Sequence, residues 1–110
     1  MIRLQKTGNK WGNYLSRIEI EGDDDQKTNF YTALYHLLIQ PNNIADVNGQ
    51  YKNAKDSVSL SPFGAYYSTF SLWDTYRAAH PLYTILTPEL LPDMINSMLL
   101  HAECQGYLPI

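Results

Sequence analysis

"DQKTNFYTALYHLLI", residues 25–39, carries the clearest helical pattern in the chain. Its apolar residues recur at the spacing of one face of an α-helix. They are Phe30, Leu34, Leu37 and Leu38, with Tyr31 and Tyr35 widening the stripe. Pro41 follows closely, and the residue before a proline is disfavoured in helical geometry, so this helix is expected to end before it. The stretch predicts that the chain is built mainly from helices.

Three adjacent acids, Asp23, Asp24 and Asp25, precede that stretch. Such a run is compatible with a metal site. Acidic residues also gather at helix starts, where unpaired N–H groups and the helix dipole favour negative charge. The second interpretation is the commoner use of the pattern, so we predict an acidic helix cap.

Two further helical regions are predicted, one near each end of the sequence. Residues 9–19 place Trp11, Leu15 and Ile18 on one face, although Gly12 weakens the helix. The last region begins at Thr87-Pro88, with proline at the favoured first position, and is predicted to end at Gly106. Its apolar stripe consists of Leu91, Met94, Ile95, Met98 and Leu99.

Between residues 40 and 70 the helical period disappears. Asn48-Gly49 is a strong hairpin signal, and "AYYSTFS", residues 65–71, alternates like a short strand. We therefore expect a long loop with a small β element here. Long loops inside compact domains are often functional.

The stretch "STFSLWDTYRAAHPL", residues 68–82, opens another helix, predicted over 72–85. Ser71 and Asp74 have the spacing of a capping box, and Arg77 is placed to pair with Asp74 across one turn. Trp73 suits either a core position or the wall of a sugar site. These patterns alone leave open whether Trp73 and Asp74 have a structural role or bind a ligand.

Composition narrows the possible functions. The chain has 110 residues, a net charge of −3 and no basic block, so nucleic acid is not an expected partner. No apolar run approaches the roughly 20 residues that cross a membrane, and the first residues lead into no signal-peptide core. A single cysteine excludes an internal disulfide. Nine tyrosines fit core packing better than a sugar-binding surface on composition alone.

Four motifs in order carry a family resemblance: "NFYTALYHLLIQPN", "DVNGQY", "YYSTFSLWDTYRAAHPLYTIL" and "GYLPI". Together they resemble the glycoside hydrolase family 92 α-mannosidases, from near Trp11 to the last residue. The resemblance implies that residues 1–110 form part of one catalytic domain. It implies a mainly α fold, a segment of an (α/α)6 toroid. About four helices are expected, with a long loop or small β hairpin between the second and third.

Members of the family are calcium-dependent enzymes that release terminal α-linked mannose with inversion. The resemblance places Trp73 and Asp74 in the pocket for that mannose, and implies a mannose-terminated glycan as ligand. The family's catalytic domain is several times longer than this chain. Its general acid, general base and most calcium ligands lie outside the residues matched, so no catalytic or metal-binding residue is assigned here.

Two hypotheses follow from the resemblance. The chain is a segment, natural or truncated, that contributes to a mannose pocket but is inactive alone. Alternatively, it is a non-catalytic helical association module derived from such an enzyme. Both predict self-association through exposed helix faces. The family is mainly bacterial and exported, but the compartment of this chain is left open.

Overall fold

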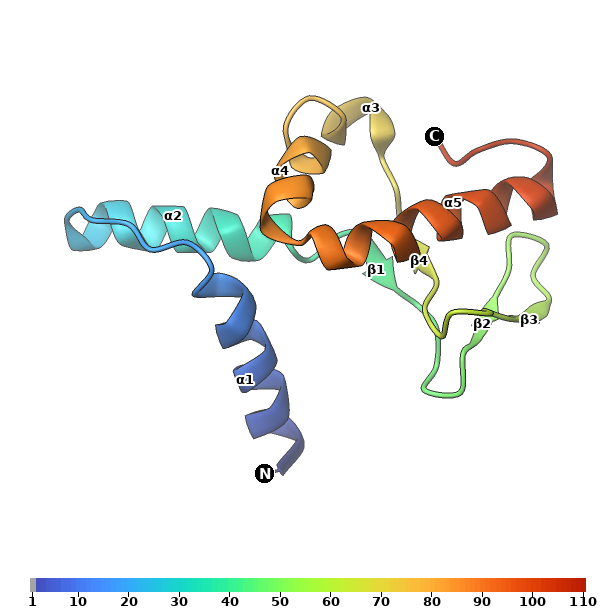
Figure 1. Cartoon of the computed structure of the whole chain (residues 1–110), viewed down its shortest axis with the longest axis horizontal. Coiled ribbons are helices and arrows are strands. Elements are labelled where there is room, and N and C mark those ends of the chain that lie inside the picture. The colour runs from blue at the N-terminus through green and yellow to red at the C-terminus, as the bar shows by residue number, and fades with distance from the viewer. Residues whose placement is uncertain (1) are drawn as a thin grey trace. The chain divides into compact units, whose positions relative to one another are not determined.

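The computed structural model describes residues 2–110. Its internal contacts divide it into two compact units, one ending at Ile39 and the other beginning at Gln40. The first unit contains two helices, and the second contains two small sheets and the remaining helices (Figure 1). No helix among the described residues is long and apolar enough to span a membrane. The prediction of a single domain over the whole chain stays a prediction.

The first unit consists of α1 (Ile2–Leu15) and α2 (Asp24–Leu37). The ring of Trp11 lies 4.7 Å from that of Tyr35, and the Tyr31 hydroxyl donates a hydrogen bond of 2.9 Å to the Ile18 carbonyl. Leu34 is the buried residue of α2. The prediction of a helix over 9–19 gave the wrong limits, because good helix formers at residues 4–6 extend α1 toward the N-terminus and Ile18 lies beyond its end.

Asp23 caps α2 as the acidic run predicted. Its Oδ1 accepts a hydrogen bond of 2.8 Å from the Gln26 N–H, and the Asp23 N–H donates to Gln26 Oε1 at 3.2 Å. This reciprocal pair is a capping box. Asp24 and Asp25 follow in the first turn, where negative charge is favourable. The helix ends before Pro41, as expected.

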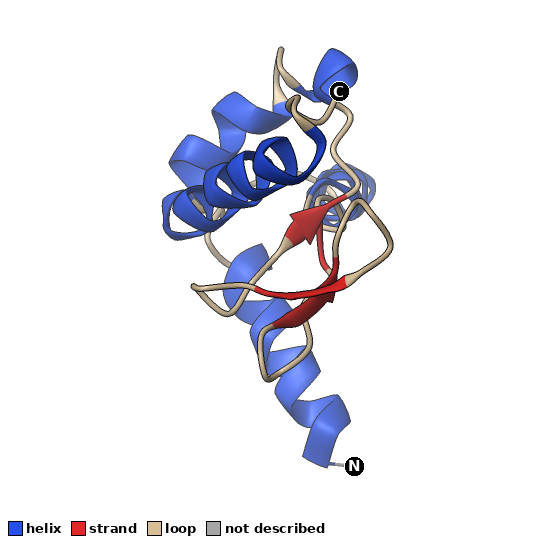
Figure 2. Cartoon of the chain, turned by 90° about the vertical axis from the view of Figure 1, so that its right-hand side faces the viewer, coloured by secondary structure: helices blue, strands red, loops and turns tan. Residues whose placement is uncertain are grey.

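The second unit contains two antiparallel two-stranded sheets, drawn in red in Figure 2. Strand β1 (Asn42–Asn43) pairs with β4 (Tyr67–Ser68), and β2 (Gln50–Lys52) pairs with β3 (Val58–Leu60). A β element between the second and third helices was predicted, and it is present.

The hairpin itself was predicted at the wrong turn. Asn48 and Gly49 do form a turn, with the Gly49 N–H donating to the Asp46 carbonyl at 2.8 Å. That turn leads from β1 into β2. These two strands do not pair with each other, since β1 pairs with β4 and β2 pairs with β3. The hairpin closes at residues 53–57. There the Asn53 side chain accepts hydrogen bonds from the N–H groups of Lys55 and Ser57, which organises the turn without the usual Asn-Gly pair.

The remaining helices are α3 (Leu72–Thr75), α4 (Ala79–Leu86), the 3-10 turn η1 (Pro88–Leu90) and α5 (Leu91–Gln105). The single helix predicted over 72–85 is therefore wrong, and Pro81 explains the break. A proline in a helix interior clashes with the carbonyl four residues earlier, but is tolerated in a first turn. Ending α3 at Thr75 places Pro81 in the first turn of α4.

The core of the second unit lies between β4, the β2–β3 hairpin and the helices. The rings of Tyr51 and Tyr66 stack with centroids 3.8 Å apart. The other buried apolar residues of this unit are Ala65, Tyr83, Leu86 and Met94. The packing interpretation of the tyrosines therefore holds for Tyr51, Tyr66 and Tyr83.

The apolar stripe predicted for α5 is only partly buried. Met94 is buried, but Ile95 and Leu99 are 54% and 51% exposed. The helix instead turns Met94 and Ser97 toward the core. Ile95 lies about 100° around the helix from Met94, since each residue advances by that angle. Gly106 ends α5 in the left-handed conformation, with φ at 87°, as predicted.

Candidate functional site

The segment Ser71–Asp74, at the start of α3, contains both residues predicted to bind sugar. Trp73 is 78% exposed, and Asp74 is exposed beside it. Trp73 is therefore not a core residue in this chain. An indole with most of its surface in water, next to a carboxylate, combines an apolar face with a hydrogen-bond acceptor. Such a pair can bind a polyhydroxylated ring.

Asp74 is held by Ser71, although not by a capping box. The Ser71 hydroxyl donates to Asp74 Oδ2 at 2.6 Å. Ser71 makes no side-chain cap hydrogen bond, and its φ of −135° and ψ of 72° differ from usual cap geometry. The predicted capping box is thus wrong, because the hydroxyl is engaged by the carboxylate instead. The consequence is that one Asp74 oxygen is oriented while the carboxylate stays exposed.

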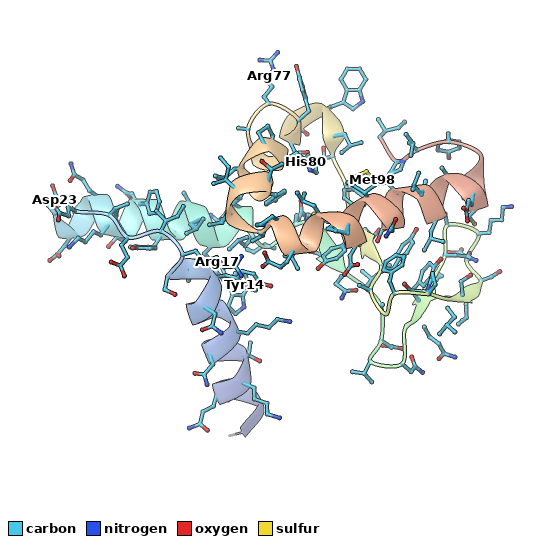
Figure 3. All side chains as sticks on the ribbon, viewed as in Figure 1. Tyr14, Arg17, Asp23, Arg77, His80 and Met98 are labelled. Atoms are coloured by element: carbon cyan, nitrogen blue, oxygen red, sulfur yellow. The ribbon has the colours of Figure 1, made fainter. Side chains whose placement is uncertain are left out.

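Arg77 does not form the predicted ion pair with Asp74. Its Nε donates to the Tyr76 hydroxyl at 2.8 Å, and the guanidinium lies 5.5 Å from the centre of the Tyr76 ring. Arg77 lies beyond the end of α3, in the turn over residues 76–78, so the spacing of an α-helix does not bring the two charges together. Figure 3 shows Arg77 extending away from this turn.

Two residues that sequence reasoning missed fix the strand leading into α3. Ser97 has no exposed surface, accepts a hydrogen bond of 2.9 Å from the Tyr67 N–H and donates one of 2.6 Å to the Asp93 carbonyl. Thr69 accepts a hydrogen bond of 3.3 Å from the Asn42 N–H of β1. A serine between Met94 and Met98 in an apolar stripe was the available signal for Ser97.

His80 and His101 each pack edge-on against a tyrosine ring. The His80 ring meets Tyr83 edge-on, with centroids 5.6 Å apart, and burial lowers the pKa of His80 below its usual value. The His101 ring meets Tyr107 in a similar edge-on contact at 5.9 Å.

Calcium takes six to eight oxygen ligands, so the acids of a site must converge. Across residues 2–110, no three His, Cys, Asp or Glu side chains are grouped in a way that could hold a metal ion. Asp23 in the acidic run is already engaged as a helix cap. The described residues therefore do not fit a calcium site of their own.

The sequence of this segment and its fold agree with one family of enzymes. Residues 3–110 match the family model for the glycosyl hydrolase family 92 catalytic domain. The chain belongs to glycoside hydrolase family 92.

Solved structures of family 92 enzymes share this fold. The α-mannosidase BT3965 from Bacteroides thetaiotaomicron is 34% identical, with a TM-score of 0.85 over 91% of this chain. The inverting mannosidase BT2199 from Bacteroides thetaiotaomicron VPI-5482 is 32% identical, with a TM-score of 0.84 over 96%. The family 92 glycosyl hydrolase ccman5 is 26% identical, with a TM-score of 0.77 over 93%. No curated protein sequence gives a match.

The predicted fold class is thereby confirmed. The chain is a mainly α segment of the family's (α/α)6 toroid, with small antiparallel strands between its second and third helices. It spans only 14% of BT3965 and 15% of BT2199.

Proposed function

We propose that this chain forms part of the terminal-mannose site of an inverting, calcium-dependent exo-α-mannosidase, with Trp73 and Asp74 as sugar contacts. Membership of family 92 supports the class of enzyme. One similar structure is an inverting mannosidase, and BT3965 has been solved in complex with mannoimidazole. The observation that carries the proposal is the exposed indole of Trp73 beside the oriented carboxylate of Asp74.

The two side chains have complementary roles in this proposal. The indole of Trp73 covers the apolar C–H face of the pyranose and gains by removing its own surface from water. A carboxylate has about four lone-pair sites, and the Ser71 hydroxyl occupies one. The remaining sites on Asp74 accept hydrogen bonds from mannose hydroxyls. Hydrogen bonds to an ionised acceptor are stronger than neutral ones, so Asp74 supplies much of the selectivity.

Asp74 is proposed to bind substrate and not to transfer protons. Inverting hydrolysis requires a general acid and a general base roughly 6.5 to 9.5 Å apart, with room for one water. We assign both to parts of the catalytic domain outside this chain, together with the calcium ligands. The 110-residue chain is accordingly expected to bind mannosides weakly and to hydrolyse none.

The proposal is tested by titrating methyl α-mannoside into the isotopically labelled chain and recording heteronuclear NMR spectra. We expect shift changes confined to Trp73, Asp74 and their neighbours. Dissociation constants of about 1 to 10 mM are expected, in the range of a few kcal/mol of binding free energy. Trp73→Ala should abolish these changes. Trp11→Phe is the matched control, because Trp11 packs against Tyr35 in the first unit and should leave binding intact.

Two results would contradict the sugar-site proposal. One is the absence of any shift at tens of millimolar mannoside. The other is a set of shifts that survives Trp73→Ala. Methyl α-glucoside serves as a second control, because it presents the same ring with a different hydroxyl arrangement and should bind more weakly.

The alternative proposal is a non-catalytic association module. One observation favours it: Ile95 and Leu99 form an i, i+4 apolar pair on α5 and remain half-exposed. Under this alternative the chain binds protein surfaces and not sugar. A chain that self-associates but gives no response to mannoside would support the module over the sugar site.

A further inference from the structure

Thr69 has a backbone conformation that its side chain opposes. Its φ is 63°, in the left-handed region. Residues with a branched Cβ are genuine outliers there, because the branch crowds the backbone. Such conformations persist only where the surrounding structure holds them in place. The contacts that hold Thr69 are therefore informative.

Those contacts come from the preceding residue and from the neighbouring strand. The Thr69 hydroxyl donates a hydrogen bond of 2.5 Å to the Ser68 carbonyl. Thr69 directly follows β4, and its Oγ1 accepts a hydrogen bond of 3.3 Å from the Asn42 N–H of β1. Asn42 is also the strand partner of Ser68, the residue before Thr69. The strand pair is fixed to α5 in turn, because Ser97 accepts the Tyr67 N–H. A hydrogen-bonded series thus runs from the buried face of α5 to Thr69.

The left-handed turn determines where the chain goes next. Only Phe70 and Ser71 separate Thr69 from the first residue of α3. An extended conformation at Thr69 would continue the direction of β4, whereas the left-handed one turns the chain away from it. The position of Trp73 and Asp74 therefore depends on the backbone conformation of Thr69.

We propose that Thr69 is a positioning residue for the sugar contacts. Its left-handed turn, held by the Asn42 N–H, directs α3 so that Trp73 and Asp74 face the ligand. This inference rests on the proposed function and adds the residue that sets the geometry of the site. Thr69 acts through α3 and does not itself contact the sugar.

Three substitutions separate the features of Thr69. Thr69→Val keeps the branched Cβ but removes the hydroxyl and with it the hydrogen bonds to the Asn42 N–H and the Ser68 carbonyl. The unfavourable conformation then loses the side-chain contacts that hold it, so the turn should relax. Thr69→Ser keeps the hydroxyl and should preserve the turn. Thr69→Gly adopts the left-handed conformation freely but also leaves it freely, so α3 should become mobile.

The position of α3 can be read without any sugar. Incorporating 5-fluorotryptophan gives two fluorine resonances, and the Trp11→Phe background identifies that of Trp73. We expect Thr69→Val to shift the Trp73 resonance and Thr69→Gly to narrow it toward that of a mobile indole. Thr69→Ser should leave it unchanged. If Thr69→Val holds the turn for about a tenth of the time, methyl α-mannoside affinity falls about tenfold.

Asp56 provides a matched control. It is the other non-glycine residue with positive φ, at 61°, among those the structure describes, and it lies in the β2–β3 turn. Asp56→Gly relaxes a turn with the same sign of φ, although aspartate tolerates this conformation better than a residue with a branched Cβ. It also removes an exposed ion pair with Lys52, which contributes little. If relaxing any turn changed the Trp73 environment, Asp56→Gly would also shift the Trp73 resonance. We expect no shift in Asp56→Gly, because its turn does not lead into α3.

The outcomes separate this inference from the proposed function. An unchanged Trp73 resonance in Thr69→Val, or a change of equal size in Asp56→Gly, would overturn the role of Thr69. A wild-type chain that binds no mannoside but shows the expected fluorine shifts would overturn the sugar site and leave Thr69 as the residue that positions α3.

Discussion

Single polar residues determine several features of this chain that its apolar pattern does not. Ser97 is the clearest case, since it occupies a core position on α5 and has no exposed surface. Its hydroxyl satisfies the Tyr67 N–H and is itself satisfied by the Asp93 carbonyl. Burying a hydroxyl costs little free energy when it both accepts and donates a hydrogen bond, as the Ser97 hydroxyl does. Removing the hydroxyl deletes both hydrogen bonds.

Ser97→Ala should therefore destabilise the second unit. The substitution deletes both hydrogen bonds of a buried hydroxyl, and the expected loss is about 1 to 3 kcal/mol in the free energy of unfolding. Urea denaturation followed by circular dichroism measures the change. Ser57→Ala, at an exposed position in the β2–β3 turn, should change the free energy by less than about 0.5 kcal/mol. Equal effects of the two substitutions would show that the Ser97 hydrogen bonds contribute nothing.

His80 gives the second unit a predicted dependence on pH. Burial lowers its pKa below the ordinary value of 6.5, so the unfolded chain takes up a proton at higher pH than the folded one. Between those two pKa values the unfolded state binds more protons, and the free energy of unfolding falls as the pH falls. The His80 contribution is complete above about pH 6.5 and is lost progressively below it.

The pH dependence can be assigned by comparing urea midpoints at pH 7.5 and 5.5. The wild-type chain should lose stability on acidification, and His80→Gln should lose less. His101→Gln, on α5, serves as the control and should behave like the wild type. A His80→Gln variant with the full wild-type loss would show that His80 does not cause the pH dependence.

At the scale of elements, the ends of helices are set by identifiable residues. Asp23 begins α2 through a capping box, Pro81 requires a new helix start at α4, and Gly106 ends α5. Each of these residues acts locally, so each could be read from the sequence. The exception is the start of α3, where the Ser71 hydroxyl binds the Asp74 carboxylate instead of the backbone.

Glycines in α1 and at the end of α5 should respond oppositely to alanine. Gly106 has φ at 87°, where a Cβ is strained whatever the space around it. Gly106→Ala should cost about 1 kcal/mol. Gly12 lies inside α1 with nothing within 4 Å of an added Cβ, so Gly12→Ala should stabilise that helix by about 0.5 to 1 kcal/mol. Hydrogen exchange of the backbone amides in α1 and α5 measures the two changes in stability. Changes of the same sign in the two variants would contradict this prediction.

At the scale of the whole molecule, many large apolar side chains remain exposed. Ile95 and Leu99 lie on one helix, whereas Val47 and Val58 lie in the β region. Adjacent apolar side chains on a helix face can bury more surface together than isolated ones, because a partner covers them at once. The α5 pair is therefore the surface through which we expect two copies to associate.

Self-association should be visible as an apparent mass that rises with concentration in light scattering. Replacing both Ile95 and Leu99 by lysine should keep the chain monomeric. Val58→Lys, an equally drastic change at an exposed strand position, should leave association unaffected. A wild-type chain that stays monomeric up to millimolar concentration would refute this expectation.

The sequence by itself determined the helical class, the family resemblance, the limits of α2 and the end of α5, because apolar periodicity, caps and prolines act over a few residues. It also singled out Trp73 and Asp74. Only the tertiary structure decided which strands pair, which face of α5 is buried, and that Trp73 is exposed. It also revealed the left-handed turn at Thr69 and the Ser97 hydrogen bonds. These features depend on contacts between residues about 30 positions apart, and such contacts leave no periodic signal in a single sequence.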